Sequence, residues 1–266
     1  MSIAPVAHGE LKPLWEAGAG VAVINFPDYR GADQRSTFVL PLPYLVYRGE
    51  KLKVDRHGVR SLFFDSERVQ LDLSAGASIP VRSDDNDARS GVPDLDPTVE
   101  IGPTLNITLH ERADKRSKLQ LKLPVRGVIA TNFERVTGAG VVFYPHLDLS
   151  LQDVYGVPDW NMGAAIGPIF ADRRYHSYFY TVEPAFATAQ RPAFSAPGGY
   201  SGSHLTLSTS RRFKRFWFGA FARYDYLGGA AFQESPLVRQ KHALAAGFGI
   251  SWIFAQSGRL VETDDE

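Results

Sequence analysis

The sequence of 266 residues contains no cysteine. Disulfide bonds, thiolate metal sites and cysteine nucleophiles are therefore excluded, because each of them needs a thiol sulfur. A net charge is also lacking, since 29 lysine and arginine residues balance 29 aspartate and glutamate residues. Such a balance creates no long-range field that attracts polyanions, and we expect no nucleic-acid partner.

Long apolar runs are absent as well. No stretch of about 18 apolar residues occurs, so the sequence offers no transmembrane helix. A membrane-spanning strand needs only about 9 to 11 residues and shows apolar side chains at every second position. A helical membrane protein is therefore excluded, whereas one that crosses with strands is not.

The N-terminus lacks a complete export signal, because residues 1–9 carry no basic start and no long apolar core. Ala7-His8-Gly9 nevertheless places small residues at the −3 and −1 positions of a cleavage site before Glu10. We interpret residues 1–13 as an N-terminal segment that holds the remnant of a truncated signal peptide. An ordinary terminal segment is the alternative.

Alternation of apolar and polar residues dominates what is present. In K-L-Q-L-K-L-P-V-R at 118–126, leucine and valine fill every second position. The same alternation recurs at 68–79, 99–110 and 243–254. Because successive side chains of a strand point to opposite faces, each segment is predicted to be a strand with one apolar face.

These segments run to about 10 residues, which suits a tilted membrane crossing better than the strands of about 5 to 6 residues usual in soluble proteins. Their other face is rich in Gly, Ser, Thr and Asn, as the crowded wet interior of a barrel requires. The sequence predicts an all-β fold, an antiparallel transmembrane up-and-down β-barrel. A soluble sandwich or lipocalin-like barrel is the alternative.

Long polar connections at 81–97, 173–197 and 228–238 contrast with short turns elsewhere, and outer-membrane barrels place such long loops on one side. Residues 51–65 are interpreted as two short strands with a turn at His57-Gly58. This interpretation places every long loop on the same side of the barrel and gives twelve strands in total. We favour twelve, with ten as the alternative. The ten long strands are predicted to begin near Trp15, Thr37, Glu67, Thr98, Ser117, Gly138, Asp159, Gly199, Phe213 and Gln240.

The barrel is predicted to span residues 14–254, followed by a polar periplasmic tail at 255–266. Charged and polar residues of both signs fall on inward positions, where they either pair and plug the interior or line a narrow pore. These lumen-facing candidates are Asp72, Glu100, Lys122, Arg126, His146, Asp148, Arg223 and Asp225.

Two polar groups fall in the long loops. Asp84, Asp85 and Asp87 lack the glycine and distal glutamate of an EF-hand, so a solvated acidic loop is expected rather than a Ca²⁺ site. Arg173 and Arg174 either contact lipopolysaccharide phosphates or belong to a loop folded over the barrel mouth.

No catalytic residue, cofactor or metal site is predicted. The seven histidines are dispersed without metal-ligand spacing. His176 with Asp172 and Ser177 could be assembled into a catalytic group, but none of them stands in a recognised nucleophile context.

Several short motifs resemble one known family. Their order and spacing, from Trp15 to Phe254, are similar to the MipA/OmpV family (MltA-interacting protein) of outer-membrane β-barrel proteins. The resemblance implies a Gram-negative outer-membrane location, with contacts to outer-membrane lipid and lipopolysaccharide. The motifs are F-P-D-Y-R-G-A-D at 26–33, L-P-L-P-Y at 40–44, P-D-L-D-P at 93–97, D-R-R-Y-H at 172–176 and S-P-L-V at 235–238.

The same resemblance implies a non-enzymatic envelope protein. The name-giving member links a lytic murein transglycosylase to a murein synthase, so a scaffold with these two enzymes as partners is the first functional hypothesis. A small-solute porin is the alternative, and an adhesin or a barrel enzyme are further options. Since the predicted periplasmic turns are short, a partner would mainly contact the N-terminal segment and the tail.

Overall fold

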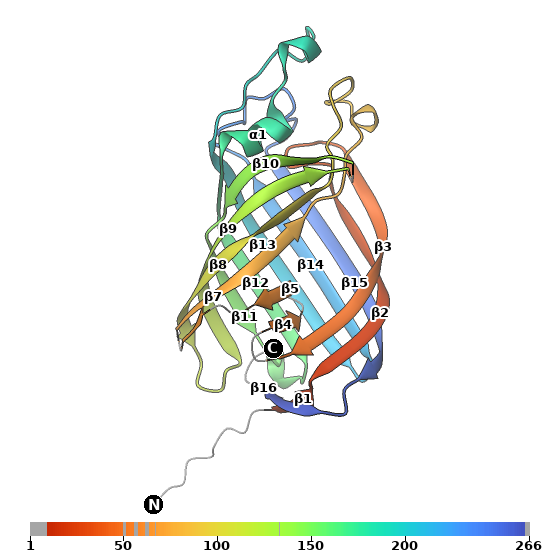
Figure 1. Cartoon of the computed structure of the whole chain (residues 1–266), viewed down its shortest axis with the longest axis vertical. Helices are drawn as coiled ribbons and strands as arrows, with labels where there is room; N and C mark the ends of the chain where they lie inside the picture. The colour runs from red at the N-terminus through yellow and green to blue at the C-terminus, as the bar shows by residue number, and fades with distance from the viewer. Residues whose placement is uncertain are drawn as a thin grey trace, which may run out of the picture.

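The computed structural model describes residues 10–49, 52–55, 58–61, 64–66, 68–132 and 134–263. Most of these residues belong to one antiparallel sheet that curls into a barrel (Figure 1). The long wall strands are β2 (Trp15–Pro27), β3 (Arg35–Arg48), β7 (Val69–Ala77), β8 (Thr98–Glu111), β9 (Ser117–Thr131), β10 (Val136–Phe143), β11 (His146–Leu151), β12 (Trp160–Ala171), β13 (Gly199–Phe213), β14 (Phe216–Tyr226) and β15 (His242–Gln256).

Neighbouring wall strands are also neighbours in sequence, as in an up-and-down barrel. β15 pairs with β2, so the last long strand lies beside the first. β10 and β11 share one position between β9 and β12. They are separated at Tyr144-Pro145, where proline offers no N–H group to the ladder.

Three short strands lie between β3 and β7 in the sequence: β4 (Leu52–Asp55), β5 (Gly58–Ser61) and β6 (Phe64–Asp65). β4 pairs with β3 and β5, β6 pairs with β7, and β5 lies beside β7. Through them the two ends of the sheet meet at one end of the barrel.

The strands of the structure correspond to those predicted from the sequence, with two additions. All ten long strands are present, one of them broken into β10 and β11, which confirms the barrel fold. The sequence favoured twelve strands. The break between β10 and β11 adds one strand and β6 adds another, so the sheet has 14 strands in the described part of the chain. Of the predicted turn, Gly58 begins β5, whereas His57 lies outside the described residues.

The outer face of the wall is apolar. Outward positions hold large exposed side chains, among them Val39 on β3 (69% exposed) and Phe248 on β15 (63%). Trp252 and Phe254 lie toward one edge of this band, and Tyr224 and Tyr226 toward the other. An apolar band edged by aromatic rings is what a wall embedded in lipid requires.

The two ends of the barrel differ, and we name them the loop end and the turn end (upper and lower in Figure 1). The loop end carries the long connections and helix α1 (Arg173–Tyr180). Tight turns, with Lys115 and Lys214 at positive φ, join strands at the turn end. There β1 (Glu10–Pro13) pairs with β16 (Leu260–Thr263), in a two-stranded ribbon.

Within the described ranges, no helix combines the length and the apolar character that a membrane crossing needs.

Candidate functional site: the barrel interior and its two ends

A cap built from the four long connections covers the loop end. These connections, at 28–34, 78–97, 172–198 and 227–241, share one buried apolar core. Its large members are Tyr29, Leu95, Tyr180, Val182, Leu227, Phe232 and Leu237.

Specific contacts tie the loops of the cap together. The rings of Tyr180 and Phe232 stack with centroids 3.6 Å apart. The hydroxyl of Tyr29 donates to the carbonyl of Leu237 (2.7 Å), and that of Tyr180 to the carbonyl of Arg30 (3.0 Å). The long loops therefore form one packed unit over the barrel mouth.

Arg89 is buried inside the cap, although no acidic side chain among the described residues hydrogen-bonds to it. Its guanidinium donates to the carbonyls of Phe179 (3.0 Å) and Pro93 (2.9 Å) and lies over the ring of Tyr29 (5.6 Å to the centroid). Since these partners come from different loops, Arg89 fixes the loops relative to one another.

His176 on α1 is fully buried beside the ring of Phe232. Its Nδ1 lies 2.6 Å from the carbonyl oxygen of Pro197, and its Nε2 has no hydrogen-bond partner among the described residues. Burial lowers the pKa of His176 below its ordinary value, so the imidazole is neutral at neutral pH.

The loop residues singled out in the sequence lie on the exposed surface of the cap: Asp84, Asp85, Asp87, Arg173 and Arg174. The guanidinium of Arg173 donates to the hydroxyl of Ser195 (3.0 Å). No group of three or more His, Asp or Glu side chains in the described part of the chain is placed to hold a metal ion.

Beneath the cap, a carboxylate on the wall binds an arginine from the cap. Arg30, in the β2–β3 loop, donates to Asp225 on β14 (3.0 Å) and to the carbonyl of Ser201 (2.7 Å). Arg223 binds the same carboxylate at 2.8 and 2.9 Å. The cap is thus fastened to the wall by a shared, buried carboxylate.

Two further ion pairs connect wall strands. Glu100 on β8 lies 3.6 Å from Arg126 on β9, and Lys122 on β9 lies 2.9 Å from Asp148 on β11. We call these pairs and the Arg30–Asp225–Arg223 group the charged belt. Each charged side chain in the belt lies beside one of opposite charge. The attraction within the pairs offsets part of the free-energy cost of removing these groups from water.

The two remaining lumen candidates contact other polar side chains. Asp72 is buried and accepts a hydrogen bond from the side-chain amide of Asn106 (3.0 Å). The ring of His146 packs against that of His204, with centroids 5.7 Å apart. All eight candidates thus have an identified neighbour.

A second charged group, which the sequence analysis missed, lies at the turn end. Glu16 on β2 is fully buried and contacts Arg212 on β13 (2.5 Å), Arg48 on β3 (3.7 Å) and the hydroxyl of Tyr44 (3.2 Å). The signal was available, since W-E-A-G-A-G places Glu16 on the polar side of the alternation in β2.

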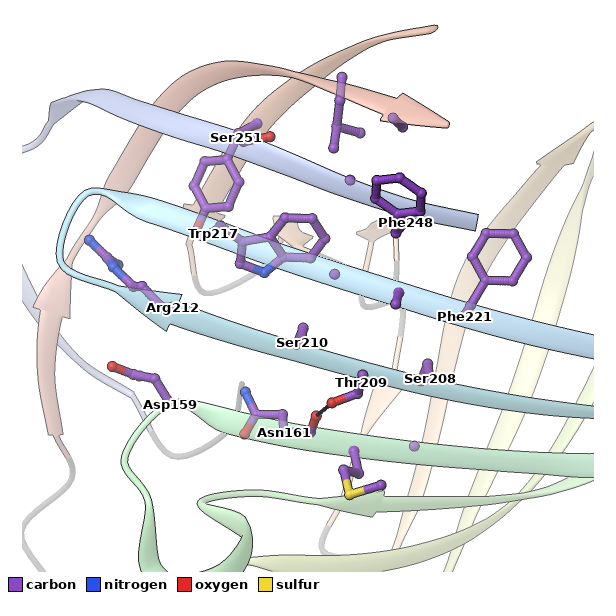
Figure 2. A pocket seen from close by; sticks show the side chains of 18 of the residues that line it. Asp159, Asn161, Ser208, Thr209, Ser210, Arg212, Trp217, Phe221, Phe248 and Ser251 are labelled. Carbon is purple, nitrogen blue, oxygen red and sulfur yellow. Dashed lines mark hydrogen bonds between the residues drawn. The ribbon is translucent and has the colours of Figure 1, made fainter. Parts of the chain in front are cut away.

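A cavity of 560 Å³ lies in the turn-end half of the barrel (Figure 2). Its lining comes from β2, β3 and β11 to β15, together with Lys12 on β1 and the turn between β11 and β12. Trp217 and Phe221 contribute aromatic surface, and Asn161 and Ser208 contribute polar groups.

An apolar outer band, long loops gathered at one end and a polar, charged interior define an outer-membrane β-barrel. The model of the family described as MltA-interacting protein MipA matches residues 19–254, and the chain belongs to that family.

Relatives support the same class. The outer membrane protein Omp26La of Vibrio anguillarum is 22% identical over 221 residues, covering 78% of this chain and 76% of the relative. OmpV of Vibrio cholerae serotype O1 is 23% identical over the same share of each chain.

Two outer-membrane proteins are among the solved structures with which the chain aligns. An outer membrane channel from Pseudomonas putida F1 aligns with a TM-score of 0.37 and 10% identity, over 95% of this chain and 100% of the channel. OprD from Pseudomonas aeruginosa aligns with a TM-score of 0.34 and 8% identity, over 98% of both chains.

Proposed function

We propose that the chain is a non-enzymatic outer-membrane scaffold that docks a lytic murein transglycosylase, together with a murein synthase, at its turn end. Outer-membrane barrels keep short turns in the periplasm, where murein lies, so the turn end is the side that such enzymes can reach. The description of the family as MltA-interacting supports this partner class. At the opposite end, exposed Arg173 and Arg174 suit the phosphate groups of lipopolysaccharide.

The β1–β16 ribbon is the observation that carries the proposal. Leu11 and Pro13 are two residues apart on β1, and Leu260 pairs with Pro13, so all three share one face of the ribbon. Leu11 is 63% exposed and Leu260 is 52% exposed. Exposed apolar side chains on a projecting ribbon offer both a contact face and strand edges for a partner.

The ribbon is fixed to the barrel rather than free. Arg48 on β3 donates from Nη1 to the carbonyl of Pro13 (2.7 Å), and its backbone N–H donates to the carbonyl of Leu14 (2.8 Å). A partner bound to the ribbon would therefore be held at a defined place under the barrel.

The test is capture of purified murein transglycosylase, and in parallel of purified murein synthase, by the folded barrel in lipid. Leu260→Glu should weaken capture at least tenfold, because it places a charge in the apolar contact face. Tyr155→Glu is the matched control, since Tyr155 is also an exposed turn-end residue (86%) but lies off the ribbon. Equal capture by wild type, Leu260→Glu and Leu11→Glu would contradict the scaffold.

A small-solute channel is the second candidate, and the 560 Å³ cavity favours it. The cap and the charged belt argue against a channel, because they occupy the loop-end half of the barrel interior. Single-channel conductance of refolded protein distinguishes the two candidates. A channel requires steady conductance whose ion selectivity shifts in Arg126→Glu, whereas a plugged barrel gives no conductance although it is folded and inserted.

A further inference from the structure

The cavity exists because the register of five strands brings small residues side by side. Asn161, Ser210, Gly219, Gly249 and Ala22 are successive partners across β12, β13, β14, β15 and β2. Larger side chains here would fill the interior. The resulting volume of 560 Å³ falls within the range of about 300 to 1,000 Å³ typical of small-molecule sites.

Aromatic rings lie along the wall on either side of this small-residue row. A Cβ atom added to Gly219 would lie 2.1 Å from Cη2 of Trp217, and one added to Gly247 would lie 2.8 Å from Cε1 of Phe221. Each ring therefore rests against a glycine backbone. Trp217 and Phe221 both line the cavity, so each presents aromatic surface to it (Figure 2).

Polar groups without internal partners surround these rings. Ser251, which pairs with Trp217 in the ladder, is fully buried at the cavity wall, and its hydroxyl has no hydrogen-bond partner among the described residues. Within the same part of the chain, the side chains of Asn161 and Ser208 also make no hydrogen bond. Unlike the enclosed hydroxyl of Ser251, the side chains of Asn161 and Ser208 are accessible from the cavity and can hydrogen-bond to a solute or to water there.

The charged residues that line the cavity, Lys12, Asp153, Asp159 and Arg212, all lie at its turn-end mouth. Arg212 binds Glu16, and Asp153 lies 3.7 Å from Arg116. A charged solute would lose its hydration in the middle of the cavity without gaining a counter-charge. The lining therefore selects for an uncharged solute.

We infer that this cavity binds a neutral saccharide of one or two sugar rings. A pyranose ring presents a face of C–H groups and a rim of hydroxyls, so it needs a flat apolar platform with hydrogen-bonding groups beside it. Trp217 and Phe221 provide the platform, and Ser208 and Asn161 provide the hydrogen-bonding groups. This binding activity is independent of the docking of murein enzymes at the ribbon.

Isothermal titration calorimetry of the folded barrel tests the inference, in a detergent that has no sugar headgroup. Glucose, N-acetylglucosamine and maltose are the probes, with glucuronate and toluene as charged and apolar comparisons. At least one neutral sugar should bind more tightly than both comparisons. Trp217→Leu should weaken that binding about tenfold, because it removes the aromatic platform.

Trp252→Leu is the matched control, since Trp252 lies on the outer face of the wall and should leave sugar binding unchanged. Ser208→Phe is a second variant that fills the cavity and should abolish binding. Folding of each variant is judged by its heat-modifiable mobility in electrophoresis. If Trp217→Leu does not fold, Ser208→Phe is used in its place. The inference is overturned if no neutral sugar binds the folded protein, if glucuronate or toluene binds as tightly, or if the folded cavity variants bind like wild type.

Discussion

The carboxylate of Glu16 lies 2.5 Å from Nη1 of Arg212, although 196 residues separate them in the sequence. Glu16 is fully buried, and Arg48 approaches the same carboxylate (3.7 Å). This contact joins β2 to β13 at the turn end of the barrel. It is the turn-end counterpart of the Arg30–Asp225 contact beneath the cap.

Glu16→Gln should lower the free energy of unfolding by about 3 to 5 kcal/mol, because it removes a fully buried charge that faces the buried guanidinium of Arg48 and the partly exposed one of Arg212. Urea unfolding in lipid vesicles, followed by tryptophan fluorescence, measures the loss. Asp114→Asn is the control, because Asp114 pairs with Arg112 in an exposed turn and should cost less than about 1 kcal/mol. Similar losses in both variants would show that burial does not set the cost.

Phe232→Ala should destabilise the cap by about 3 to 5 kcal/mol, since it removes a fully buried ring that stacks on Tyr180. Hydrogen exchange of residues 173–197 should accelerate, while exchange in the wall strands stays slow. Tyr155→Ala, at an exposed turn-end position, should change neither region. Unchanged protection of the loop in Phe232→Ala would mean that the shared core does not hold the cap together.

The cap should also weaken in acid. Burial holds the pKa of His176 below its ordinary value of 6.5, so the unfolded cap binds a proton more readily than the folded cap. The stabilising contribution of neutral His176 is therefore complete above about pH 6.5 and decreases as the pH falls from there toward the lowered pKa.

Hydrogen exchange of α1, measured between about pH 8 and pH 5 after correction for the intrinsic rate, follows this loss. His176→Gln should reduce the pH dependence, whereas His110→Gln, at an exposed position on β8, should leave it intact. An equal pH dependence in wild type and His176→Gln would assign the effect to other groups.

Gly140→Ala should disturb the start of α1. Gly140 has a φ of 107°, and an added Cβ would lie 2.2 Å from Oδ1 of Asp172, the oxygen that accepts from the N–H of Tyr175 at the helix start. Backbone strain and the lost cap together should cost about 2 to 3 kcal/mol.

Gly156→Ala is the control for strain alone, because Gly156 also has a positive φ (73°) but nothing lies within 4 Å of the added atom. It should cost about 1 to 2 kcal/mol. Thermal unfolding of both variants gives the comparison. Equal shifts would mean that the contact with Asp172 adds nothing.

The sequence by itself determined the barrel. Alternation in segments such as 118–126 specifies an apolar outer face and a polar inner face, because strand geometry sends successive side chains to opposite sides. Polar runs without this alternation marked the long loops. Pairs such as Glu100 with Arg126 could be expected on the inner face, since both fall on polar positions of neighbouring strands.

Only the tertiary structure decided how the ends are built. The cap core joins Tyr29, Leu95, Tyr180 and Phe232 from four loops, and no local pattern shows that these loops converge. The pairing of β1 with β16 likewise depends on closure of the barrel, which brings both end segments to the turn end. Local periodicity specifies which face a side chain takes, whereas contacts between distant segments follow from closure, and closure is a property of the whole sheet.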